Sequence, residues 1–132
     1  MNASETVISK IADAIAFAAR SASAIARSLN KGYNVPDSRP RRNNNPGDLE
    51  QDVTGKAIGH DGPYVVYASP QDGLDALKHQ VRLMFKGSHI YKPSMTIGEV
   101  AGHYTTTDPE AWARNVAGHL GVSIQSRLED LL

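Results

Sequence analysis

The chain has 132 residues, and its 14 basic side chains balance its 14 acidic ones, so its formal charge near neutral pH is zero. This balance argues against a general nucleic-acid-binding protein, which would carry a basic excess. Because cysteine is absent, the composition also excludes a disulfide framework and zinc sites built on thiolates.

The first 32 residues have the pattern of one long helix. This pattern predicts a separate, coiled-coil-like anchoring helix over residues 1–32, which self-associates or binds other proteins through residues 7–29. Its apolar residues alternate spacings of three and four, as in a coiled-coil seam rather than a broad core-facing stripe. The seam positions are Ile8, Ile11, Ile15, Ala18, Ala22, Ile25 and Leu29.

Two other roles for this helix stay open. It can fold back on its own domain, as terminal segments do when they are tied down, or it can act as a membrane or export segment. Charged side chains at Lys10, Asp13, Arg20 and Arg27 interrupt every apolar run that is long enough to span a bilayer. We therefore expect no stable membrane span.

A linker and a polar bend follow the helix. Residues 33–40 contain Pro36 and Pro40 among other turn-forming residues, which predicts a linker before a domain of residues 41–132. The bend, residues 41–49, reads RRNNNPGDL and places three amides before a Pro-Gly pair. Such a pair favours a type II turn with Gly47 at positive φ. Each amide offers one acceptor and two donors, which suit sugar hydroxyls and N-acetyl groups.

The rest of the chain predicts one hairpin and several short helices. Two short apolar runs, 54–59 and 64–67, flank an Asp-Gly pair, which is a hairpin signal. Helix-start signals then predict helices over about 70–86, 96–103 and 107–120, and the tail from residue 126 adds a final turn. The predicted fold class is α+β and mostly helical, with a small β-hairpin preceded by a long N-terminal helix.

The order of these segments resembles a known phage family. It carries RNNNPG followed by Asp-Leu, then YASPQDGLDAL at residues 67–77, a Thr-Ile helix start, and NVAGHLGV near the end. These segments are similar to the phage lysozyme-like structural proteins, which are small virion-associated domains related to lytic transglycosylases. The similarity runs from about Arg41 to the C-terminus. Asp48 stands where that family usually has asparagine.

The resemblance implies a lysozyme-like domain whose sugar cleft lies between the hairpin and a helical lobe. Such a protein is expected in the virion, anchored there by its N-terminal helix, and to degrade peptidoglycan glycan strands in the bacterial periplasm during genome entry. The alternative is a catalytically inactive structural tail or baseplate protein that keeps the fold. A free endolysin is a third possibility. The expected partners are glycan strands and other tail proteins, with no nucleic acid.

Cleavage of a glycosidic bond requires a general acid that stays protonated near neutral pH. A hydrolase usually adds a second carboxylate. A lytic transglycosylase instead closes an anhydro ring with the substrate's own hydroxyl, so one glutamate serves as acid and then as base. Glu50 is the only glutamate between the first helix and the hairpin and is the first catalytic candidate, with Asp48 second. Both also suit exposed turn acids.

The substrate-binding candidates are amides and aromatic rings. The asparagines can bond N-acetyl groups, and tyrosines can stack on pyranose faces. Each tyrosine also fits a half-buried core ring whose hydroxyl is satisfied. The candidates are Asn43, Asn44, Asn45, Tyr64, Tyr67 and Tyr104.

No pattern in the chain predicts a metal or a cofactor. The histidines are scattered, and no H-E-x-x-H spacing occurs, so a zinc amidase or endopeptidase is disfavoured. A Gly-rich phosphate loop is missing, and so is the G-x-S-x-G elbow of serine hydrolases.

Overall fold

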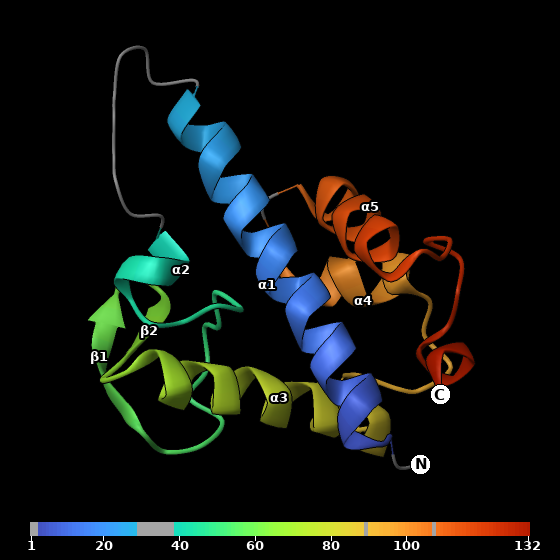
Figure 1. The fold of residues 1–132 in the computed structure, drawn as a ribbon, viewed down its shortest axis with the longest axis horizontal. Coiled ribbons are helices and arrows are strands. Elements are labelled where there is room, and N and C mark those ends of the chain that lie inside the picture. The colour runs from blue at the N-terminus through green and yellow to red at the C-terminus, as the bar shows by residue number, and fades with distance from the viewer. Residues whose placement is uncertain (1–2, 29–38, 89, 107) are drawn as a thin grey trace.

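Helices form most of the structure, and a two-stranded antiparallel sheet lies to one side of them (Figure 1). The computed structural model describes residues 3–28, 39–88, 90–106 and 108–132, with the side chains of the first helix described as far as Arg20. It confirms a mixed α+β protein that is mostly helical. The elements are α1 (Glu5–Ser28), α2 (Arg39–Arg42), β1 (Ala57–Asp61), β2 (Tyr64–Tyr67), α3 (Pro70–Lys86), α4 (Ile97–Tyr104), α5 (Pro109–Leu120) and the 3-10 helix η1 (Leu128–Leu131).

The N-terminal helix α1 is part of the core. Ile8, Ile11, Ile15 and Ala18 are buried and belong to one apolar cluster with residues of α3, α4 and α5. Figure 1 shows α1 crossing the domain, and it packs chiefly against α5 and α3. The prediction of a separate helix whose seam faces a partner is therefore wrong as far as Ala18, because the chain's own helices cover that seam.

Small residues beside the seam explain why α1 packs against its own domain. Ala12, Ala14, Ala16 and Ala19 are buried as well, so the covered surface of α1 is a broad stripe rather than a narrow seam. A broad stripe is the pattern of a helix that faces a globular core. The predicted seam positions from Ala22 onward lie outside the described side chains. Within the described ranges, no helix is long and apolar enough to cross a membrane.

The later helices begin and end within two residues of the bounds that the sequence predicts. Ser69 caps α3 by accepting a hydrogen bond from the Asp72 N–H, and Thr96 with Glu99 forms the capping box of α4. The α5 helix ends at Gly121, which is in the left-handed conformation. The tail supplies the short helix η1. Local capping chemistry therefore decides the bounds of these elements.

The hairpin is also confirmed, but its first strand is shifted. β1 and β2 pair antiparallel, and β1 begins at Ala57 instead of Thr54. The cause is the Asp52 carboxylate, which accepts hydrogen bonds from three backbone N–H groups between Thr54 and Ala57 and so holds these residues in a loop. Burial raises the pKa of Asp52, but these backbone hydrogen bonds outweigh it and the pKa is lowered.

A short helix replaces the end of the predicted linker. α2 covers Arg39–Arg42, and Pro40 within it is buried, so residues 39 and 40 belong to the domain. Backbone hydrogen bonds from Asn43 N to Arg39 O and from Asn45 N to Pro40 O, at 3.0 and 2.8 Å, connect α2 to the bend. The remainder of the predicted linker, residues 33–38, lies outside the described residues.

Replacing Ile15 by alanine tests the place of α1 in the core. Ile15→Ala truncates a fully buried side chain, and we expect the free energy of unfolding to fall by about 2–5 kcal/mol in urea denaturation of the full chain. Arg20→Ala, on the exposed side of the same helix, is the control and should change it by less than about 0.5 kcal/mol. Equal effects of the two substitutions would contradict the packing of α1.

Candidate functional site

Asn45 connects the polar bend to the hairpin. Its side chain is fully buried. The amide nitrogen donates to the carbonyl oxygens of Leu49 and Val65, and the amide oxygen accepts from the Leu49 N–H, each at 2.9 Å. Asn45 has no exposed polar atom to offer a ligand, so the prediction that it binds a sugar is wrong.

The two asparagines before it also face the hairpin. Asn43 is buried, and its amide donates to the Asp61 carboxylate at 3.2 Å. Asn44 is half-buried and donates to the carbonyl oxygen of Tyr67 at 3.0 Å. Neither lines the pocket described below. The three amides therefore hold the bend against β1 and β2, which corrects the expectation that they form the sugar-facing wall.

The backbone of the bend differs from the predicted turn. Positive φ occurs at Asn44 (52°) and Asp48 (54°) and not at Gly47, which rules out a type II turn. Gly47 is needed for space instead. A Cβ atom there would lie 2.6 Å from Leu77 Cδ1 and 2.8 Å from the Tyr104 hydroxyl oxygen.

A second close approach brings α3 against the bend. A Cβ atom on Gly73 would lie 1.7 Å from the carbonyl oxygen of Asn44, which is backbone and cannot move aside like a flexible side chain. Only glycine permits this contact. Two glycines thus set the distance between the bend and the helix that forms the other side of the pocket.

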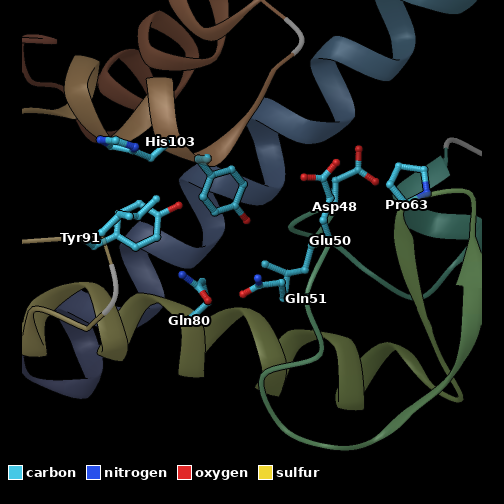
Figure 2. A pocket seen from close by; sticks show the side chains of 10 residues that line it. Asp48, Glu50, Gln51, Pro63, Gln80, Tyr91 and His103 are labelled. Carbon is cyan, nitrogen blue, oxygen red and sulfur yellow. The ribbon is translucent and has the colours of Figure 1, made fainter.

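An open pocket lies between the hairpin turn, the segment after the bend, and α3 and α4. Its volume is about 560 Å³, within the range of small-molecule sites. Figure 2 shows Asp48, Glu50 and Pro63 toward one end and Tyr91 and His103 toward the other. The lining residues are Asp48, Leu49, Glu50, Gln51, Pro63, Gln80, Ile90, Tyr91, His103 and Tyr104.

The structure brings both predicted acids to this pocket, in different states. Asp48 is bound by Arg39, whose Nε donates to both carboxylate oxygens at 3.0 and 2.9 Å and whose Nη2 donates to one of them. The hydrogen bond to Asp48 raises the pKa of Arg39 against the opposing effect of burial. Glu50 is exposed, and its carboxylate has no hydrogen bond or ion pair to the described part of the chain. Glu50 is therefore the free acid of the site.

The predicted tyrosines separate into two groups. Tyr64 and Tyr67 do not line the pocket. The Arg39 guanidinium lies 3.9 Å from the ring centroid of Tyr64, and Tyr67 is 1% exposed with its hydroxyl donating to Asp52 at 3.3 Å. Burial first, and then the Asp52 charge, raise the pKa of Tyr67 to about 12. The prediction that Tyr67 stacks on a sugar is wrong because protein atoms bury its ring. Tyr64 is half-buried, has one ring face against Arg39 and lies outside the pocket.

Tyr104 lines the pocket as predicted, but it is also structural. Its ring stacks on Trp112 with centroids 4.8 Å apart. Its hydroxyl donates to the Gly47 carbonyl oxygen at 2.8 Å, and burial raises its pKa well above the ordinary value. One ring face and the hydroxyl are therefore already occupied.

Sequence reasoning missed several lining residues, chiefly Gln80, Tyr91 and His103. Gln80 comes directly before the core residue Val81 on α3. Its place beside the apolar stripe of that helix is the one sequence feature that could have indicated it. Tyr91 lies in a segment assigned to no predicted element. It is mostly buried, which raises its pKa to about 12, and its ring meets His103 edge-on at 6.3 Å.

No protein-family model matches the chain, and no curated protein or solved structure matches it either. Among the described residues, no group of three or more histidine, aspartate and glutamate side chains is placed to hold a metal ion. A functional conclusion therefore depends on the pocket itself and on the sequence resemblance.

Changing Asn45 to aspartate tests its structural role. Asn45→Asp keeps the shape but turns a carboxylate oxygen toward the carbonyl oxygens of Leu49 and Val65, so we expect a loss of several kcal/mol, at about 1–3 kcal/mol per orphaned group. Burial raises the pKa of the new acid in the folded state, so the loss should shrink as the pH falls and the acid becomes protonated. Urea denaturation at pH 7 and pH 4 measures this, with the α5 substitution Asn115→Asp as control. A loss no larger than that of the control would contradict the assignment.

A pair of glycine substitutions tests the contact between α3 and the bend. Gly73→Ala forces a methyl group onto the Asn44 carbonyl oxygen, and we expect a destabilisation of at least about 1–3 kcal/mol. Gly102→Ala, in α4 with open space around the added Cβ, should be neutral or stabilising by up to about 1 kcal/mol. Thermal unfolding of the two variants compares them directly. Similar melting temperatures would contradict the close approach.

Proposed function

We propose that this chain is a virion-associated phage protein whose lysozyme-like domain binds peptidoglycan glycan strands in the pocket and cleaves them with Glu50. The single observation that carries the proposal is a free carboxylate in an open pocket beside amide groups and aromatic rings. Amides and aromatic rings are the groups that bind sugar hydroxyls and pyranose faces. The virion location and the action in the periplasm and cell wall rest on the sequence resemblance.

The two carboxylates favour one reaction type. Hydrolysis commonly uses a pair of carboxylates on the two sides of the scissile bond. Here Arg39 engages both oxygens of Asp48. Of the two carboxylates, Glu50 is the one with no hydrogen bond to the described residues, and it is the group proposed to exchange a proton with the substrate. A lytic transglycosylase needs only one such group. In that reaction Glu50 protonates the bridging oxygen, then accepts the proton of the hydroxyl on the same sugar that closes the anhydro ring.

A binding protein without catalysis is the second candidate, and the exposure of Glu50 favours it. A general acid is usually kept protonated by burial away from water. Glu50 is open to solvent in the chain alone, so a bound glycan would have to cover it. A structural tail or baseplate protein that grips glycan strands needs the pocket but not a protonated Glu50.

Anchoring in the particle cannot use the first half of the α1 seam. Ile8, Ile11 and Ile15 are covered by the domain itself. The proposed attachment to other tail proteins would therefore use a surface other than these three side chains. For the same reason, activity should be measured on the full chain, because a fragment of residues 41–132 would lack part of its core.

Glu50→Gln, assayed on purified murein sacculi with the full chain, tests the proposed chemistry. We expect release of soluble muropeptides with anhydro ends to fall by about 100-fold or more, since the variant cannot exchange the proton. Glu110→Gln, at an exposed position on α5 outside the pocket, should release muropeptides at the unaltered rate.

Two other outcomes would separate the alternatives. Unchanged release by Glu50→Gln would remove Glu50 from the mechanism. An unaltered chain that sediments with sacculi but releases nothing would support the non-catalytic structural protein.

A further inference from the structure

Some of the polar groups that line the pocket form hydrogen bonds within the protein, and others do not. The Asp48 carboxylate is bound by Arg39, and the Tyr104 hydroxyl is bound to the Gly47 carbonyl. Within the described part of the chain, the Gln80 amide and the Tyr91 hydroxyl have no hydrogen-bond partner, and both residues line the pocket. These two groups are therefore available to a ligand.

The protein holds the two groups to different degrees. Gln80 lies on α3 next to Val81, which is fully buried. Tyr91 is 8% exposed and belongs to the main apolar cluster, and its N–H donates to the Ser88 carbonyl at 3.2 Å. The buried Tyr91 side chain therefore loses little conformational freedom on binding, whereas the half-exposed Gln80 side chain is ordered by the ligand.

The surroundings of the two groups add an apolar contact. Ile90 is 50% exposed and lines the same pocket. In Figure 2 the Tyr91 hydroxyl points toward the middle of the lining side chains, Gln80 lies on that side of the pocket, and the Glu50 carboxylate lies toward the opposite end. One side of the pocket thus combines an O–H donor with an amide that offers an acceptor and a donor. The aliphatic side chain of Ile90, the residue before Tyr91 in the chain, lines the same pocket.

We propose that this side of the pocket, formed by Gln80, Ile90 and Tyr91, binds the acetamido group of an N-acetylhexosamine. The Tyr91 hydroxyl donates to the acetamido carbonyl oxygen, the Gln80 side-chain oxygen accepts from the acetamido N–H, and Ile90 contacts the methyl group. This assignment rests on the proposed binding of glycan strands in the pocket. It gives the recognition role expected of Asn43, Asn44 and Asn45 to residues outside the bend.

The chemical match is specific to the acetamido group. A sugar hydroxyl in its place could bond to Tyr91 or Gln80, but it would leave Ile90 facing water and one polar group without its partner. A site built to bond a polar group discriminates against an analogue that lacks it, because the unpaired protein group stays desolvated. A tyrosine hydroxyl is protonated throughout the neutral range, and burial raises the pKa of Tyr91 further, to about 12.

Titration with two neutral trisaccharides tests the subsite. The β-1,4-linked trimer of N-acetylglucosamine carries acetamido groups, whereas the corresponding glucose trimer, cellotriose, carries hydroxyls in their place. We expect the full chain to prefer the acetylated trimer. Tyr91→Phe and Gln80→Ala should each weaken its binding by about 3- to 10-fold, the effect of one lost hydrogen bond. Each should weaken cellotriose binding less, because one hydroxyl does not bond to both groups at once as the acetamido group does.

Gln71→Ala is the matched control, because Gln71 lies on the same helix outside the pocket and its side-chain amide donates to Asp75. It should keep the affinity for both trimers. Thermal unfolding of the Tyr91 variant checks that it is folded, and Gln80→Ala gives a second measurement that does not disturb the core.

The outcomes separate the subsite from the proposed function. Equal affinity of the unaltered chain for the two trimers, or a preference that survives both substitutions, would overturn the subsite while leaving glycan binding intact. A preference that depends on both residues in a chain that releases no muropeptides would support the subsite and remove the catalytic proposal. Binding of neither trimer would overturn the subsite directly.

Discussion

The buried carboxamide of Asn45 is the interaction on which the rest of the site depends. It connects the bend to the strand β2 through Leu49 and Val65. Inside the protein no water replaces these hydrogen bonds, so the bend cannot separate from the hairpin without leaving several polar groups unpaired. The segment from Asp48 to Gln51 is thereby held beside the hairpin, where it lines the pocket.

Close steric contacts set the distance between the bend and α3, which forms the opposite side of the pocket. α3 meets the bend at Gly73, where an added Cβ would strike the Asn44 carbonyl oxygen, and at Gly47, where it would crowd the Leu77 side chain. The left-handed conformation of Asp48 and its bonds to Arg39 fix the direction of the chain just before Glu50. A carboxylate that maintains the backbone is unavailable as a proton donor, and this separates the two acids that the sequence treats as alternatives.

The polar side chains of the bend and the pocket thus divide into structural groups and free groups. The asparagines, Asp48 and Tyr67 are occupied by the protein, whereas Glu50, Gln80 and Tyr91 face the pocket with unused hydrogen-bonding capacity. A glycan strand offers the complementary groups, with a bridging oxygen for an acid and acetamido groups for an amide and a hydroxyl. These free groups therefore support the proposed binding of glycan strands more directly than the asparagine-rich bend does.

The sequence by itself determined the elements whose signals are local. These elements include the helices capped by Ser69 and Thr96, the helix that ends at Gly121, and the hairpin. Each depends on residues within a few positions of each other, so the sequence pattern alone predicts it. Only the tertiary structure decided which faces of those elements are covered. Whether Ile15 faces a partner or the chain's own helices, and whether an asparagine faces a ligand or a carbonyl group, depends on contacts between residues far apart in the chain. No local pattern in the sequence indicates such contacts.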